Sequence, residues 1–564
     1  MRRGCALLMR RALIDRRGML IAGAAAAAAP RAAWAQSLSP GQFTHGVASG
    51  DPAPDGVVLW TRFTGGDGRI AWEIAEDDVF AHIIQRGEAR ADATRDFCVK
   101  IDVRGLAPGR AYHYRFLSAS GPSITGLTRT APEQAQSLTV GLVSCANYGF
   151  GYFHAYGHLA RREDVELVLH TGDYIYEYGL DEYPRAALTV PGRAFDPERE
   201  IVTLDDYYAR YRQYHTDPDL LALRQAKPIS AVWDDHEIAN DAANGGAQNH
   251  QRNEGAYVDR VAAAAKAYFD WMPIRRPDPN AVRLYRSLDW GDLARILLID
   301  TRYIGRTRQL DYRRALGLRL LSDGERAAAA VEEFRRTQLD DPARTLLGAD
   351  QEQWLGRELA ASKQRGHAWQ IVAQQIAMGE QLIGEGAAAF VPASAHGNTR
   401  RYVDVAERLG RMNMPWNLDA WDGYPAARSR FLEACAVQGA NVAVLSGDSH
   451  NTWLNNLAAA NGGRLAAIEF AGASVTSPGL EVPLAGAPSG GREAMMQGKN
   501  PHLAWCDVSN RGYGVLRFTR AACVSEWVAL PDVRSQSPLA PTITRIEAET
   551  SQNAGPGAWR LSPA

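Results

Sequence analysis

Four short apolar runs in this chain each lead directly into residues that can hold a metal ion. The runs span residues 138–143, 165–169, 229–233 and 442–445. Runs of this length and composition are typical of strands buried on both faces of a sheet. In layered α/β folds, ligands collect just beyond the carboxyl ends of such strands. The pattern therefore favours an α/β fold in which distant segments meet at one site.

The residues that follow the runs have side chains suited to metal chemistry. They are Cys145 after the first run, Asp173 and Tyr176 after the second, Asp234, Asp235, His236 and Glu237 after the third, and Asp448 and His450 after the fourth. One strand that ends in an aspartate means little. Four strand ends of this kind indicate a single assembled site.

Asp173 and Tyr176 lie three residues apart, so both can reach one cation. The carboxylate can also bridge to a second cation, whereas a phenolate favours a hard ion of high charge such as ferric iron. The alternative for Tyr176 is an ordinary buried aromatic, because Tyr174 and Tyr178 stand beside it. Cys145 can bind iron as a thiolate, or it can be a buried and inert cysteine.

The third run leads into three acids and a histidine within residues 234–237. Such density costs like-charge repulsion unless cations neutralise it, and a solvated acidic turn is the alternative. Asn240 offers a neutral amide oxygen, which suits calcium. Asp448 and His450 are two residues apart, so both can point the same way in an extended segment. The last pair is weak evidence alone and gains weight from the other strand ends.

The amino terminus has the features of an export signal. Residues 1–17 carry six arginines, an apolar stretch covers 19–29, and residues 33–35 have the Ala-x-Ala pattern of a cleavage site. We predict a signal peptide over residues 1–35 and a periplasmic or secreted protein. The Arg16-Arg17 pair resembles a twin-arginine signal, which hands folded proteins to its own export machinery; an arginine-rich Sec signal is the alternative. We expect no transmembrane segment elsewhere.

Charge and cysteine content exclude some classes of protein. Removing residues 1–35 takes away seven of the 62 basic and one of the 64 acidic side chains, which leaves a formal net charge of about −8. This argues against specific or bulk binding of nucleic acid. Five of the six cysteines remain, so an exported protein would have at least one unpaired thiol. We predict that this thiol is Cys145. Cys506 and Cys523 could pair, which spacing alone cannot establish.

The chain is too long for one hydrophobic core and should divide. Residues 40–131 contain strand-length runs separated by Gly, Asp and Pro. Within them, the stretch 106–116 resembles the turn and strand that carry the tyrosine corner of immunoglobulin and fibronectin-like β-sandwiches; a generic hairpin is the alternative. From 137 to 564, apolar strands alternate with helical stretches, among them 256–271 and a surface insertion over 306–347.

Taken together, these motifs resemble the PhoD family of alkaline phosphatases and phosphodiesterases, relatives of the metallophosphoesterases. The resemblance covers nearly all of the chain after the predicted signal. In chain order, the motifs that carry it are residues 43–52, 144–145, 172–177, 233–237, 240–241, 272–275, 421–425, 446–450 and 500–503. Motifs of this number and order are highly specific.

The resemblance implies a fold and two kinds of metal. The fold would be a metallophosphoesterase-type four-layer sandwich, two mixed sheets between helices, preceded by the small β-sandwich. The metals would be one ferric ion and calcium. The iron ligands implied by position are Cys145, Asp173, Tyr176 and His450. The calcium ligands implied are Asp173 as a bridge with Asn240 and Asp448, and with Asp241 in reserve.

The implied activity is that of an alkaline phosphatase acting on small phosphate monoesters, diesters or both. A metal-bound water would attack in line, without a covalent phospho-enzyme. The catalytic residues would be Asp173, Asp234, Asp235 and His236, the last bonding a nonbridging oxygen or protonating the leaving group. Which of Asp234 and Asp235 contacts metal stays open. The alternatives are a phospholipase D-like diesterase acting on phospholipid and an exported, calcium-stabilised surface-binding protein. We expect a monomer.

Overall fold

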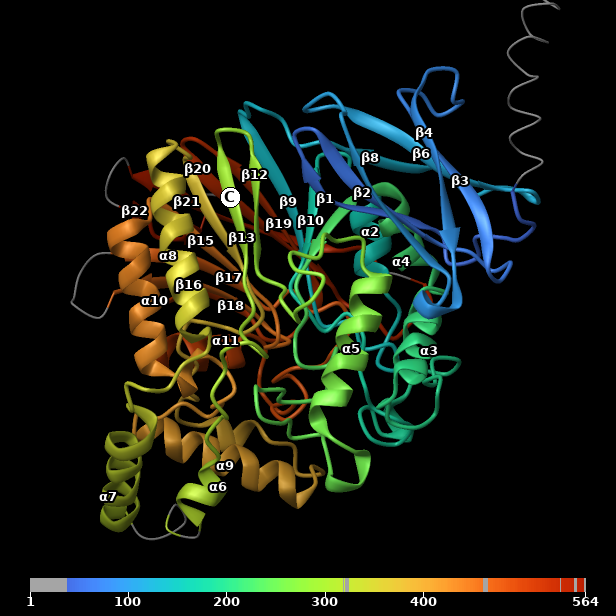
Figure 1. Ribbon diagram of the computed structural model, residues 1–564. Coiled ribbons are helices and arrows are strands. Elements are labelled where there is room, and N and C mark those ends of the chain that lie inside the picture. The colour runs from blue at the N-terminus through green and yellow to red at the C-terminus, as the bar shows by residue number, and fades with distance from the viewer. Residues whose placement is uncertain are drawn as a thin grey trace, which may run out of the picture.

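The computed structural model describes residues 38–317, 319, 324–459, 465–537, 539–551 and 555–561. Two β-sheets form its centre with helices on their outer faces, and a third sheet lies at the upper right (Figure 1). The predicted signal peptide, residues 1–35, lies outside the described residues. Within the described ranges, no helix is both long enough and apolar enough to cross a membrane.

The largest sheet has eleven strands, and parallel strands form its middle. These are β9 (Ser137–Val143), β10 (Leu167–His170) and β11 (Pro228–Ala231). Beyond β9 lie β19 (Arg511–Thr519), β20 (Ala522–Leu530), β21 (Thr542–Ser551), β22 (Gly555–Pro556) and β23 (Arg560–Leu561). Beyond β11 lie β1 (Val47–Ala53), β2 (Gly56–Arg62) and β5 (Cys98–Arg104). The carboxyl ends of β9, β10 and β11 therefore share one edge.

The second sheet has seven strands. Their order is β12 (Arg286–Trp290), β13 (Ala294–Leu298), β14 (Trp369–Ala373), β15 (Asn441–Ser446), β17 (Leu465–Ala471), β16 (Thr452–Ala458) and β18 (Leu503–Asp507). Strands β13, β14, β15 and β17 pair in parallel. An isolated parallel bridge between Ser144 and Ser474 joins the ends of the two sheets, so their carboxyl edges meet.

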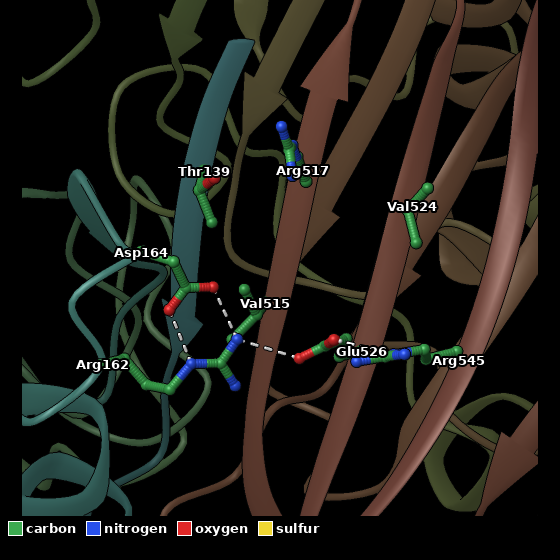
Figure 2. Close-up of a pocket in the computed structure, with 8 residues that line it drawn as sticks. All are labelled: Thr139, Arg162, Asp164, Val515, Arg517, Val524, Glu526 and Arg545. Atoms are coloured by element: carbon green, nitrogen blue, oxygen red, sulfur yellow. Dashed lines mark hydrogen bonds and ion pairs between the residues drawn. The ribbon is translucent and has the colours of Figure 1, made fainter.

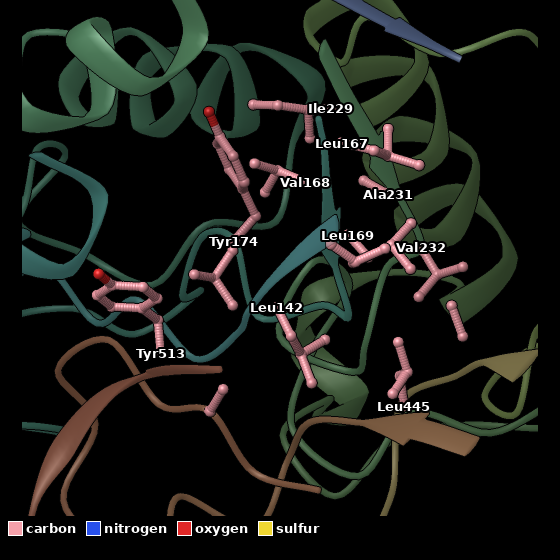
Figure 3. Close-up of a cluster of buried hydrophobic side chains, with 14 of the residues drawn as sticks. Leu142, Leu167, Val168, Leu169, Tyr174, Ile229, Ala231, Val232, Leu445 and Tyr513 are labelled. Atoms are coloured by element: carbon pink, nitrogen blue, oxygen red, sulfur yellow. The ribbon is translucent and has the colours of Figure 1, made fainter. Parts of the chain in front are cut away.

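The two sheets pack face to face with helices outside them. Leu142 of the first sheet and Leu445 of the second belong to one buried core (Figure 3). On the second sheet's outer side lie α8 (Gly348–Gln364) and α10 (Pro425–Gln438). On the first sheet's outer side lie α2 (His154–Ala160), α4 (Pro218–Ala226) and α5 (Tyr257–Trp271), with α3 (Leu204–Tyr214) against α5. The α/β prediction is confirmed, as is the helix expected over 256–271.

The predicted insertion at 306–347 is partly helical in the residues that the structure describes. It contains α6 (Tyr312–Ala315), α7 (Gly324–Phe334) and a π-helical turn, Arg335–Leu339. A small core joins it to α9 (Gly397–Arg411), with Phe334 against Leu409. These helices lie together at the lower end of Figure 1. Another helix, α11 (Gly491–Lys499), comes just before β18 in the chain.

The amino-terminal strands form a third sheet that faces part of the first. Its strands are β4 (Ile83–Ala91), β3 (Gly68–Ala75), β6 (Ala111–Ser118), β7 (Gly121–Pro122) and β8 (Gly126–Arg129). Val57 and Leu59 of β2 pack against Ile70 and Tyr114 in the core between them. The hydroxyl of Tyr112 accepts a hydrogen bond from the backbone N–H of Ala107 at 3.0 Å, the bond back that a tyrosine corner requires.

The amino-terminal region shares a sheet with the rest of the chain. Strand β1 pairs in parallel with β11, with Ser49 opposite Pro228. Strands β1, β2 and β5 therefore continue the eleven-stranded sheet. The immunoglobulin-like classification of residues 40–131 and the domain boundary before residue 137 stay predictions.

The described cysteines are all buried and free, among them Cys506 and Cys523. Cys506 lies in a core with Trp453, whereas Cys523 lies in the core between the two sheets. The pairing that the sequence left open does not occur.

A buried ion pair fixes β1 to the segment after α5. Both carboxylate oxygens of Asp51 accept hydrogen bonds from Arg286, at 2.8 and 2.9 Å, and one also accepts from the backbone N–H of Arg275 at 2.7 Å. Asp51 is fully buried. Two of the sequence motifs, 43–52 and 272–275, therefore serve at least in part to hold this junction together.

Replacing Asp51 with Asn should lower the stability by about 3–5 kcal/mol at neutral pH, because Arg286 then lacks its buried partner. Burial alone would raise the pKa of Asp51, but Arg286 and Arg275 hold it below its ordinary value. A lowered pKa contributes stability above the unfolded pKa, about 3.9, and this contribution is lost as pH falls through the folded value.

Thermal unfolding followed by circular dichroism at pH 7 and at decreasing pH checks this prediction. The gap between wild type and Asp51→Asn should shrink below about pH 4. Asp55→Asn is the matched control, because the Asp55–Arg104 pair is exposed and should contribute less than about 1 kcal/mol. Equal losses in the two variants would contradict the assignment.

Candidate metal centre

Four of the predicted ligands lie on strained backbone just past strand ends. Cys145 follows β9, Asp173 follows β10, and Asp448 and His450 follow β15. Their φ angles are 57°, 55°, 60° and 57°, in the left-handed region that residues other than glycine rarely adopt. Such strain, about 1–3 kcal/mol per residue, persists where the surroundings impose it and clusters at functional sites.

The predicted iron ligands meet in space. Ligand atoms of Cys145, Asp173 and His450 lie within 4.8 Å of one another. The Tyr176 hydroxyl lies 3.0 Å from Asp173 Oδ2 and 3.4 Å from His450 Nε2. Nδ1 of His450 donates to the Pro478 carbonyl at 2.9 Å, which leaves Nε2 facing the cluster. The structure therefore brings all four residues together.

This half of the site fits a transition-metal ion. Oδ1 of Asp173 is buried and has no hydrogen-bond partner among the described residues, so it offers a free lone pair to a cation. Burial raises the pKa of the Cys145 thiol and of the Tyr176 phenol well above their ordinary values. Both groups would keep their protons unless a cation favoured the anions. Sulfur, phenol, imidazole and carboxylate together suit such an ion.

Asp235 is the centre of the acidic half. Its carboxylate lies within 4.8 Å of ligand atoms in three groups, and these groups are Asp173 with His236, Asp234 with Asp448, and Asp241 with Asp419. Burial alone would raise the pKa of Asp235, but Arg302 and His236 bring it to about 2. Burial raises the pKa of Asp448 to about 7. An all-oxygen set of this kind suits calcium.

Asn240, predicted as a calcium ligand, lies just past the turn that follows Asp235. The backbone N–H groups of Ile238 and Ala239 both bond the Asp235 carbonyl at 2.7 Å, which turns the chain away after Asp235. The side-chain amide of Asn240 then donates to Gln248 at 3.0 Å. Asp235 lies within 4.8 Å of ligand atoms of Asp173 in one group and of Asp448 in another, and Asn240 stays a predicted calcium ligand. Asp241, the reserve candidate, does join the acidic half.

His236 is held in one orientation by a buried carboxylate. Its Nδ1 lies 2.7 Å from Glu177, whose other oxygen accepts from the Asn240 N–H at 2.7 Å and from Asn249 at 2.9 Å. Burial alone would lower the pKa of His236, but Asp235, Asp173 and Glu177 raise it well above its ordinary value. Nε2 is thus the nitrogen left for a ligand. The sequence placed Glu177 in a motif without assigning this contact.

Arg302 is a site residue that sequence reasoning missed. Its guanidinium is fully buried and contacts four carboxylates. They belong to Asp234, Asp235, Asp419 and Asp448. Arg302 follows β13, so the strand-end rule pointed to it, but a search for metal ligands passes over a cation. Asp419 follows no strand and gave no signal.

Glu237 fastens two of the site loops to each other. Its carboxylate accepts backbone N–H groups from Asp173 at 3.0 Å, Tyr174 at 2.6 Å and Asp234 at 2.7 Å. Burial raises its pKa to about 8. Glu237 therefore sets the distance between the end of β10 and the end of β11.

A cavity lies on the first sheet near the start of β9, away from the cluster of predicted ligands (Figure 2). It measures about 440 Å³ and includes residues of β9, β19, β20 and β21. Arg162 spans it, paired with Asp164 at 2.7 Å and with Glu526 at 3.0 Å. None of the predicted site residues lines this cavity, and the chemistry lies at the opposite end of the strands.

Comparisons with known proteins agree with this architecture. The sequence profile of the PhoD-like phosphatase family matches residues 138–527, and that of the family's N-terminal domain matches residues 26–132. Alkaline phosphatase D of Bacillus subtilis (strain 168) is 34% identical over 499 residues, which cover 85% of this chain and 76% of that protein.

Solved structures show the same likeness. A structure of PhoD superposes with a TM-score of 0.71 at 30% identity, covering 93% of this chain and 92% of that one. The purple acid phosphatase PPD1 from yellow lupin (Lupinus luteus) seeds superposes at 0.50 with 12% identity, covering 90% and 74%, which shows a likeness of fold alone.

The fold and the matches together define a hydrolase of phosphoric esters. More narrowly, the chain belongs to the PhoD-like phosphatase family. The resemblance drawn from the sequence motifs is therefore confirmed.

Changing Glu237 to Gln should lower turnover of a phosphate monoester by about tenfold or more. Both carboxylate oxygens of Glu237 accept backbone N–H groups, whereas a glutamine side chain has only one acceptor oxygen. At least one of the three N–H groups therefore loses its acceptor, at a cost of about 1–3 kcal/mol. Steady-state kinetics with p-nitrophenyl phosphate, together with urea unfolding, checks this. Glu182→Gln is the control, because Glu182 accepts one N–H in an exposed loop. Lost stability with kcat and KM unchanged would show that Glu237 only supports the fold.

Proposed function

We propose that this protein is an exported, metal-dependent alkaline phosphatase that hydrolyses phosphate monoesters, diesters or both. Ferric iron would be held by Cys145, Asp173, Tyr176 and His450. Calcium would be held by Asp173, Asn240 and Asp448, with Asp235 within 4.8 Å of the two carboxylates in separate groups. The observation that carries the proposal is the position of Asp173, which lies within 4.8 Å of ligand atoms in both sets and has one oxygen without a partner.

The cations, when bound, would withdraw charge from the phosphate and supply an activated water. The chain's own groups would do the rest. Glu177 fixes Nδ1 of His236, so Nε2 is free to bond a nonbridging phosphate oxygen or to give a proton to the leaving group. Glu237 holds Asp173 and Asp234 in register. Asp173 and Asp448 both lie on strained backbone, and each carboxylate lies within 4.8 Å of Asp235.

Export through the twin-arginine route is supported by the leader sequence and suits this site. Cys145 and Tyr176 are fully buried, so a metal bound to them would be enclosed as the chain folds. A signal that exports folded proteins would let the cell load the metal before export. The surface-binding alternative loses support, because the chain belongs to a phosphatase family.

Activity should depend on calcium. Exhaustive treatment with a calcium chelator should abolish hydrolysis, since the acidic half then loses the charge that opposes its carboxylates, and added calcium should restore it. Parallel assays with p-nitrophenyl phosphate, bis-p-nitrophenyl phosphate and phosphatidylcholine would show which ester class is preferred, including a phospholipase D-like diesterase. The activity of Asp173→Ala should be at least about a hundredfold lower than that of wild type, with or without added calcium. Full activity without bound calcium would contradict the proposal.

The purified protein should be coloured if Tyr176 binds ferric iron as a phenolate. Charge transfer from phenolate and thiolate to iron would absorb visible light, which zinc or calcium cannot produce because neither has a suitable vacant d level. Tyr176→Phe should shift or bleach the band, whereas Tyr178→Phe, a neighbour outside the ligand set, should keep it. Visible spectra with elemental analysis check this. A colourless, active protein containing zinc and no iron would contradict the iron assignment alone.

A further inference from the structure

Arg302 lies where the acidic half of the site would take a cation. Its guanidinium contacts Asp419 at 2.5 Å, Asp448 at 2.8 Å and Asp235 at 3.5 Å, and it also bonds Asp234. These carboxylates come from three separate segments: the end of β11, the loop before α10 and the end of β15. One positive charge thus holds three segments together.

The backbone under Arg302 is fixed, so only its side chain is free to adjust. The N–H groups of Arg302 and Tyr303 both bond Asp300 Oδ1, at 2.9 and 3.0 Å. Thr301 bonds Gln375 through its N–H at 2.9 Å and its hydroxyl at 2.6 Å. A long, flexible side chain on a rigid stem can follow a change in charge without moving β13.

Arg302 and a cation would use the same oxygens. Oδ1 of Asp448 accepts from Arg302, and Asp448 also belongs to the group with Asp234 and Asp235 that could hold a metal. A divalent ion there would share an acceptor with the guanidinium and repel it at a few ångströms. Contacts made by Arg302 are therefore more favourable before the cation binds than afterwards.

We propose that Arg302 is an internal counter-ion that stabilises the acidic half before metal loading and competes with calcium for Asp448 and Asp235. Arg302 is a positioning residue in this role and sets the calcium affinity of the site. The inference rests on the proposed function, because it requires that these acids bind calcium.

Arg302→Met tests the inference by removing the charge while keeping a long apolar side chain. Without Arg302 the unloaded carboxylates repel one another, so the chelated variant should unfold at a lower temperature than chelated wild type. Loss of Arg302 would destabilise the calcium-free state more than the calcium-bound state, and such a change tightens binding. The dissociation constant for calcium, measured by isothermal titration calorimetry, should therefore fall by at least about tenfold.

Two further variants separate charge from local packing. Arg302→Lys keeps the charge and should bind calcium within about threefold of wild type. Arg344 is a buried arginine nearby that bonds the Gly423 carbonyl at 3.1 Å. Arg344→Met should therefore lower the melting temperature and leave the calcium affinity within about threefold of wild type.

Calcium affinity that is unchanged or weaker in Arg302→Met would overturn the inference, because Arg302 would then be aligning the ligands and not competing for them. If Arg302→Met is recovered only with calcium bound, the chelator concentration that removes half of the calcium is measured instead, and it should exceed that of wild type. Failure of wild-type protein to bind calcium at all would overturn the calcium assignment itself, which is a distinguishable result.

Discussion

The rest of the structure depends on how the carboxylates buried between the two sheets are compensated. An uncompensated buried charge costs several kcal/mol, and this site gathers acids from β10, β11 and β15. The buried acids of the site are compensated by different partners. Glu237 takes backbone N–H groups from Asp173, Tyr174 and Asp234, and Glu177 takes His236. The acids nearest the junction share one guanidinium, that of Arg302. Asp173 and Asp234 each keep one buried oxygen without a hydrogen-bond partner among the described residues.

The sheets supply the rigidity that such compensation requires. The Ser144–Ser474 bridge ties the end of β9 to the second sheet, and the backbone N–H groups of Cys145 and Ala146 bond the carbonyls of Gly172 and Asp173 at 3.2 and 2.9 Å. These bonds stabilise left-handed φ angles that the residues would otherwise avoid. The sandwich therefore holds strained loops in place, and the strain directs the side chains toward the junction.

Much of this site could be predicted from sequence, because buried strands and the residues after them are local features. The four apolar runs all formed strands, and Cys145, Asp173, Tyr176 and His450 do meet. The residues that sequence reasoning missed depend on contacts that sequence does not display. Arg302 and Asp419 join the site across 117 residues of sequence, and no local pattern links them. Likewise, the local sequence of β1 and β2 cannot reveal that they continue the large sheet.

The two halves of the site differ in what they need from a cation. Burial raises the pKa of the Cys145 thiol and of the Tyr176 phenol well above their ordinary values, so these two groups would keep their protons until a metal displaced them. The acidic half cannot become neutral in the same way as a whole, because the pKa of Asp235 lies near 2 beside Arg302 and His236. Arg302 is thus the counter-charge of the acidic half, whereas Cys145 and Tyr176 keep their protons. On the proposed function, each half would take up a cation by a different route: release of protons on one side, and displacement of a guanidinium on the other.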